Sequence, residues 1–151
     1  MPTVRAQIDV TGPAGAAEAL WYDTERWPAF VDGFAHVAKL EGPWPDSGAK
    51  IVWDSTPNGR GRVVEQVVDR VPGEGQTSVV EDPRLTGTQR VTFQPLDGGV
   101  ALGLELEYRL KGQSVLQPLV DLFFIRRALR DSLRRTLLRF SRELAADLEL
   151  L

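Results

Sequence analysis

The amino-acid sequence predicts an α+β fold in which a curved antiparallel sheet of six to seven strands wraps around one long C-terminal helix. Three observations lead to this prediction. The first and last predicted strands alternate apolar and polar residues, the segments between them are short and bounded by turn residues, and the C-terminal part carries leucines at helical spacing. A length of 151 residues favours a single domain over residues 1–151, and no repeat or linker divides it.

The N-terminal part is expected to form one strand and two short helices. Alternating apolar residues predict a strand over Thr3–Val10, which a following Gly-Pro pair ends. The alanine-rich stretch Ala14–Tyr22 predicts the first short helix. A second short helix is expected from Glu25 to about Phe34, with Thr24 as its N-cap.

Six further strands are expected, joined by short connections that contain Gly, Pro, Asn or Asp, so that neighbours pair antiparallel as a meander. Asn58-Gly59 predicts a two-residue hairpin. In the last strand one face is almost wholly apolar, whereas Glu105 and Glu107 lie on the other, which indicates a sheet solvated on one side. The expected strands are His36–Glu41, Ala49–Ser55, Arg60–Arg70, Gln76–Glu81, Leu85–Gln94 and Val100–Leu110.

One long amphipathic helix is expected within Ser114–Leu150, where apolar residues recur at three- or four-residue steps over about 30 residues, or about 45 Å. This stretch carries seven arginines. Arg126 shares its azimuth with Leu133 and Leu137, so it either projects inward or snorkels sideways, and snorkelling or an internal pair is favoured. For the outward arginines, the favoured use is intrahelical salt bridges with the interleaved acids Asp131, Glu143 and Asp147.

Composition excludes several classes of site. The net charge of −3 offers no global attraction for nucleic acid, and the chain has no cysteine for disulfides, thiol nucleophiles or cysteine-ligated metals. His36 is the only histidine, and metal-ligand spacing is missing, so no metal site and no cofactor are predicted. The N-terminus lacks signal-peptide features, and no apolar run reaches the ~18 residues that cross a bilayer, so a cytoplasmic location is expected.

Three local stretches, together with the order of elements, carry a resemblance to a known superfamily. They are the aromatic Trp-Pro segment Trp21–Phe30, the Leu40-Glu41-Gly42 and Gly48-Ala49 pair of motifs, and Phe123-Phe124-Ile125-Arg126-Arg127. Over essentially its whole length the chain resembles the START-like (SRPBCC, Bet v 1-like helix-grip) superfamily, specifically its polyketide cyclase/dehydrase and lipid-transport branch. This superfamily holds carriers, receptors, cyclases and aromatases, so the resemblance implies the helix-grip fold without naming a reaction.

A concave sheet around one helix is expected to leave an internal apolar cavity, because side chains do not always fill such a space. A few polar groups on its walls, such as Gln89, Ser55 and Tyr108, would either orient a guest or bond to backbone or water within an ordinary core, and the second use is favoured. The residues expected to contact a ligand are Trp27, Phe30, Trp53, Ser55, Gln89, Val91, Phe93, Leu104, Leu106, Tyr108, Leu119, Leu122 and Arg126.

Catalytic candidates are few. Tyr108, Arg126 and His36 are the side chains considered for acid–base chemistry, but no catalytic triad or phosphate loop is evident. Whether any reaction occurs is left open by the sequence. Glu105 and Glu107 share a strand face, which is the outward, solvated one.

Three functions remain as alternatives. The first is non-catalytic binding or transport of a small hydrophobic molecule, such as a lipid, polyketide or aromatic compound. The second is a cyclase- or aromatase-type enzyme in which polar pocket residues move protons. The third is a partner- or membrane-binding module that uses the basic face of the C-terminal helix; a homodimer through Phe123 and Phe124 belongs here, and membrane contact is not favoured.

Overall fold

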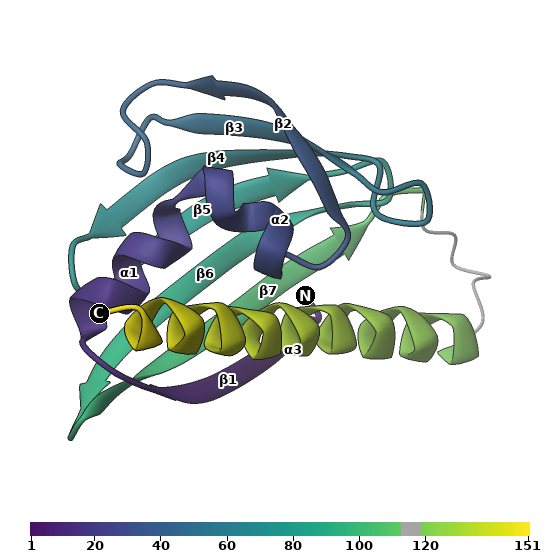
Figure 1. Cartoon of the computed structure of the whole chain (residues 1–151). Coiled ribbons are helices and arrows are strands. Elements are labelled where there is room, and N and C mark those ends of the chain that lie inside the picture. Colours follow the sequence, from purple (N-terminus) through teal and green to yellow (C-terminus); the bar gives the residue numbers. More distant parts are fainter. Residues whose placement is uncertain (113–118) are drawn as a thin grey trace.

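The structure, a computed structural model, describes residues 1–112 and 119–151 and confirms the predicted architecture. A seven-stranded antiparallel sheet curves around the helix α3, with its strands in the order β1-β7-β6-β5-β4-β3-β2 (Figure 1). Strands β2 to β7 form the expected meander, and β1 adds to the sheet beside β7. The strands are β1 Thr3–Thr11, β2 Phe34–Glu41, β3 Lys50–Ser55, β4 Arg62–Val71, β5 Gly75–Glu81, β6 Leu85–Leu96 and β7 Gly99–Leu110.

The alternation of β7 places its apolar residues in the core, as expected. Leu104 and Leu106 are buried, whereas Glu105 lies on the outer face and binds Arg5 and Arg90 from the two neighbouring strands. Because side chains alternate between the two faces of a strand, this register turns the apolar face of β7 toward α3.

Helix α3 (Leu119–Glu149) has 31 residues and therefore extends for about 46 Å across the concave face of the sheet (Figure 1). In its C-terminal half Leu137, Phe140 and Leu144 are fully buried, and each such side chain stabilises the fold by about 1.5–3 kcal/mol. In its N-terminal half Ile125 and Leu129 are only partly buried. Within the described residues, no helix combines the length and apolar character needed to cross a membrane.

The elements after β1 differ in part from the prediction. Helix α1 (Ala14–Tyr22) forms as expected, but the second helix, predicted from Glu25 to Phe34, is much shorter. It consists of a 3-10 turn, η1 (Thr24–Arg26), and one α-helical turn, α2 (Trp27–Phe30). Val31 turns to extended backbone, and Phe34 already pairs with Ser55 of β3, so strand pairing ends the helix early.

The prediction of a two-residue hairpin at Asn58-Gly59 is wrong. Strands β3 and β4 separate beyond the Asp54–Arg62 pair, which leaves residues 56–61 as a longer loop and takes Arg60 out of the strand. The tight two-residue hairpin instead joins β6 and β7, where Leu96 pairs with Gly99. Its second residue, Gly98, has φ +72°, a conformation that glycine adopts without strain.

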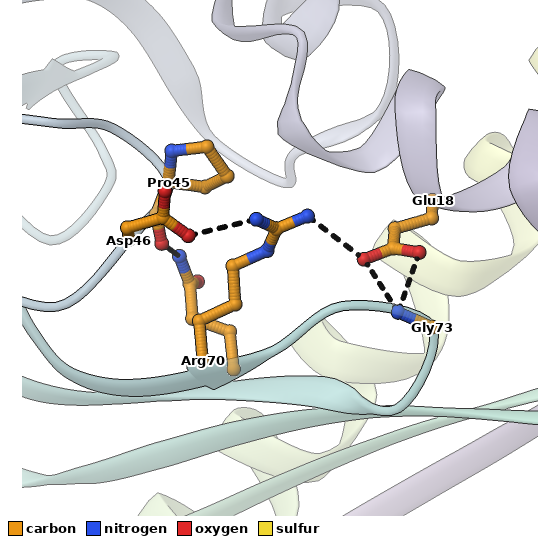
Figure 2. A network of polar contacts seen from close by, with 6 residues as sticks. Glu18, Pro45, Asp46, Arg70 and Gly73 are labelled. Carbon is orange, nitrogen blue, oxygen red and sulfur yellow. Dashed lines mark hydrogen bonds and ion pairs between the residues drawn. The ribbon is translucent and has the colours of Figure 1, made fainter.

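A partly buried ion network links α1 to β4 and to the segment between β2 and β3. Figure 2 shows Arg70 of β4 between Asp46, at 2.7 Å, and Glu18 of α1, at 3.1 Å. Glu18 also accepts hydrogen bonds from the backbone N–H of Gly73, and the Arg70 guanidinium lies 5.0 Å from the centre of the Tyr22 ring. Burial raises the pKa of Tyr22 to about 12, so this phenol stays neutral.

Among the described residues, Glu143 and Asp147 of α3 do not form the expected intrahelical salt bridges. Glu143 and Asp147 instead bind Arg26 of η1, at 2.9 and 2.8 Å. This prediction was wrong because the short helices bring a charged residue of their own against α3, and an arginine on another element reaches both carboxylates at once.

Candidate functional site

A small polar chamber lies between the sheet and the middle of α3, with a volume of about 60 Å³. Four of the predicted ligand contacts, Trp27, Trp53, Gln89 and Leu104, are brought together in its lining. The remaining polar groups on its wall are Asp32, Arg60, Glu65, Gln76, Ser132 and Thr136. The volume holds a few water molecules and is too small for a lipid, so the expected apolar internal cavity is replaced by a smaller polar one.

Glu65 is the most unusual residue of the chamber, and it is not among the site residues predicted from the sequence. It lies on the inward face of β4 between Val63 and Val67, and it is 7% exposed. The Trp53 indole Nε1 donates a 2.6 Å hydrogen bond to its carboxylate. Burial raises the pKa of Glu65, with the Trp53 hydrogen bond and the charge of Arg60 opposing the rise. The sequence feature that could have identified Glu65 is its alternation with Val63 and Val67, which puts all three side chains on the same face of the strand.

Arg60 reaches the chamber from the β3–β4 loop. Its Nε donates to Asp82 at 2.7 Å, and the Asp82 side chain is only 2% exposed. Asp82 also accepts hydrogen bonds from the backbone N–H groups of Arg84 and Leu85, which fix it in the turn between β5 and β6. The Arg60 Nη2 atom is buried and has no hydrogen-bond partner in the described part of the chain.

Asp32, in the segment after α2, joins the rim of the chamber to α3. Its carboxylate accepts hydrogen bonds from Ser132 Oγ at 2.7 Å and from Arg135 Nε and Nη2, both at 3.0 Å. Arg139 adds a contact at 3.2 Å, and the Asp32 N–H donates to Thr136 Oγ1. Burial alone would raise the pKa of Asp32, but the hydrogen bonds and charges of these groups hold it below its usual range.

An open groove of about 490 Å³ adjoins the chamber, and we call it the entrance groove. It shares Asp32, Arg60 and Ser132 with the chamber. Its apolar wall is formed by Leu85, Leu110, Ile125, Ala128 and Leu129. A volume of several hundred Å³ is the size of small-molecule sites in proteins.

A second groove of about 570 Å³, the end groove, lies beside the first turns of α3. It brings together three predicted site residues, Tyr108, Leu122 and Arg126. Arg126 is exposed and donates to the backbone oxygen of Thr3 at 3.3 Å, so it snorkels toward β1, as favoured, and does not enter the chamber. Burial raises the pKa of Tyr108, which the nearby charge of Arg126 partly offsets.

The other predicted site residues lie elsewhere. Phe30, Val91, Phe93 and Leu106 are packed in the two core clusters. The hydroxyl of Ser55 is buried beneath the β3–β4 loop, close to Gly59, and the side chain of Leu119 lies outside the described residues.

His36 is exposed on β2, where its Nε2 atom lies 3.0 Å from Asp54 across the outer surface of the sheet. The chamber wall does not include it. In the described ranges, no cluster of three or more histidine, aspartate or glutamate side chains is placed to hold a metal ion. The carboxyl groups that line the chamber are those of Asp32 and Glu65, whereas Tyr108 and Arg126 line the end groove and His36 lies on the outer surface of the sheet.

The start of α3 carries exposed apolar side chains. Phe123 and Phe124 are 64% and 60% exposed, and Arg126 and Arg127 follow them on the exposed side of the helix. The partner-, dimer- and membrane-binding alternatives depend on this surface, and they remain predictions.

Comparison with known proteins agrees with this architecture. The family described as polyketide cyclase / dehydrase and lipid transport matches residues 1–145. TTHA0849 from Thermus thermophilus superposes with a TM-score of 0.75 at 16% identity, over 97% of this chain and 99% of that one. The Polyketide_cyc-like protein Cgl2372 from Corynebacterium glutamicum superposes with a TM-score of 0.67 at 21% identity, over 99% of this chain and 96% of that one. DynU16, encoded in the dynemicin biosynthetic locus, gives 0.68 at 15% identity, over 95% of this chain but 47% of its own.

No curated protein matches the chain, and identities this low to solved structures establish a shared fold alone. The family match extends over nearly the whole chain and includes every element that lines the chamber and the entrance groove. The helix-grip fold and the family together indicate a hydrophobic ligand-binding domain. The chain belongs to the polyketide cyclase / dehydrase and lipid transport family.

Proposed function

We propose that this protein binds and carries a small hydrophobic molecule without transforming it. The observation that supports this function is the entrance groove, whose apolar wall adjoins a polar chamber. The apolar body of a guest would lie against Ile125, Leu129 and Leu85, and its polar end would reach the chamber. A few convergent polar groups beside an apolar wall are the usual composition of a ligand site.

A neutral probe that fluoresces in apolar surroundings, such as the methyl ester of a naphthalene-labelled fatty acid, tests this proposal by titration. Ala128 is exposed on α3 and lines the entrance groove, so Ala128→Trp fills the groove without disturbing the core. The matched control is Ala146→Trp, at another exposed alanine of the same helix. We expect Ala128→Trp to weaken binding of the probe about tenfold, which corresponds to about 1.4 kcal/mol of binding free energy. Ala146→Trp should leave the affinity for the probe unchanged. Absence of saturable binding, or equal binding by both variants, would contradict the proposal.

The second candidate is a cyclase- or dehydratase-type enzyme, and the burial of Glu65 favours it. A carboxyl group with a raised pKa in a small chamber is suited to moving a proton to or from carbon. Exchange of the α-hydrogens of a bound ketone with deuterated water, followed by NMR, would reveal this activity. It should disappear in Glu65→Gln and persist in Glu81→Gln, whose carboxylate is exposed and pairs with Lys111. Exchange at the uncatalysed rate in the unmodified protein would rule it out.

A further inference from the structure

The chamber offers hydrogen-bond donors that the fold itself does not use. Resting on the function proposed above, we infer that Arg60 and Glu65 bind a neutral carbonyl oxygen of the ligand, so that the guest is an apolar molecule carrying a ketone, ester or quinone group. Both residues line the chamber, and Arg60 also lines the entrance groove, where the apolar body would lie.

Arg60 is oriented before any ligand arrives. Its Nε is held by Asp82 at 2.7 Å, and Asp82 is fixed in turn by two backbone N–H groups of its own turn. Nη2 is left buried without a protein acceptor in the described residues. A buried N–H donor with no acceptor destabilises its surroundings, and a carbonyl oxygen entering the chamber would satisfy it.

Glu65 supplies the second donor. The Trp53 indole fixes one carboxyl oxygen at 2.6 Å, and burial favours the neutral acid, which carries an O–H group. A carbonyl oxygen has two lone pairs and accepts from two donors at once. A guanidinium N–H and a carboxylic O–H around one chamber therefore match a single carbonyl oxygen.

The charges around the chamber favour a neutral carbonyl over a carboxylate. The positive charge of Arg60 is already balanced by Asp82, and Asp32 pairs with both Arg135 and Arg139. Arg60 is the only cation among the described residues of the chamber wall, so a ligand carboxylate would add a negative charge near Asp32 that Arg60 is not free to neutralise. A neutral carbonyl needs only the donors.

Isothermal titration of the full chain with three naphthalene derivatives of similar shape tests the inference. The probes are 2-acetonaphthone, which is a ketone, 2-ethylnaphthalene, which has no oxygen, and 2-naphthoate, which is a carboxylate. We expect the ketone to bind at least about tenfold more tightly than each of the other two, as one charge-assisted hydrogen bond implies. This comparison uses the unmodified protein and does not depend on the folding of a variant.

Arg60→Met should remove the preference for the ketone over 2-ethylnaphthalene. The matched control is Arg62→Met, because Arg62 is exposed and pairs with Asp54 on the outer face of the sheet. Equal binding of ketone and hydrocarbon, tighter binding of the carboxylate, or a ketone preference that survives Arg60→Met would each overturn the inference while leaving the proposed function intact. If none of the three probes binds, the proposed function fails together with it.

Discussion

The contacts of Asp32 provide a sharp test of how α3 is held at the rim of the chamber. Asp32→Asn removes the negative charge but keeps the size of the side chain and one acceptor oxygen. The carboxylate binds Arg135 and Arg139, whose side chains are 51% and 45% exposed, together with Ser132. Ion pairs this exposed contribute about 0.2–1 kcal/mol each after solvent screening. Weakening the Ser132 bond costs about 1 kcal/mol at most, so the whole change is about 0.4–3 kcal/mol.

The assay is urea unfolding at neutral and acidic pH, followed by tryptophan fluorescence. The pKa of Asp32 is lowered in the folded protein because the hydrogen bonds and charges of Arg135 and Ser132 outweigh burial. A lowered pKa contributes stability above the unfolded pKa, near 3.9, and loses it as pH falls through the folded value. The advantage of the unmodified protein over Asp32→Asn should therefore be full at neutral pH and vanish in strong acid.

Asp54→Asn is the matched control, because Asp54 also binds an arginine but does so on the outer face of the sheet. Its unfolding midpoint should change little. If Asp32→Asn were as stable as the unmodified protein at neutral pH, or if the difference between them did not depend on pH, these ion pairs would not be what holds α3 at the rim.

Two further predictions concern buried charges. The pKa of Glu65 is raised by burial, so the stability of the unmodified protein should fall as pH rises from the unfolded value, near 4.3, through the folded one, at about 1.4 kcal/mol per unit of pKa difference. Glu65→Gln has no titrating group at this position, so the free energy of unfolding of the variant, relative to that of the unmodified protein, should rise with pH over this range and then level off. A difference in unfolding free energy that does not change with pH would contradict the buried position of Glu65. Arg70→Met should cost about 1–3 kcal/mol in the same assay, because it leaves Glu18, 14% exposed, without its cation. Arg62→Met is its exposed control, and equal losses in the two variants would show that the network in Figure 2 adds nothing.

The architecture could be predicted from the sequence because it depends on local periodicity. The alternation in β7 and the leucines of α3 each indicate which face is buried, and a sheet and a helix with one apolar face each must cover one another. The errors came where tertiary pairing overrides local preference. Phe34 joins β2 and ends the second helix, and the loop around Asn58 opens beyond the Asp54–Arg62 pair.

The site was harder to predict than the fold. Gln89, Trp53 and Leu104 were placed on the inner face by alternation, and the chamber includes all three. Tyr108 and Arg126 were each expected to contact the ligand, and both line the end groove. Arg60 was predicted to lie in a strand, but it lies in the loop between β3 and β4. Its position at the chamber depends on the shape of that loop and could not be predicted from the sequence.

By itself the sequence determined the curved sheet, the long helix across it and the side of the sheet on which a guest would lie, since these follow from residue spacing along single elements. Only the tertiary structure decided what kind of space remains. The indoles and leucines of the core fill most of the interior, and Glu65, Arg60 and Asp32 meet there from elements far apart in the chain. The proximity of these residues depends on strand register and loop geometry, which bring residues from distant parts of the chain together and produce no periodic pattern in the sequence.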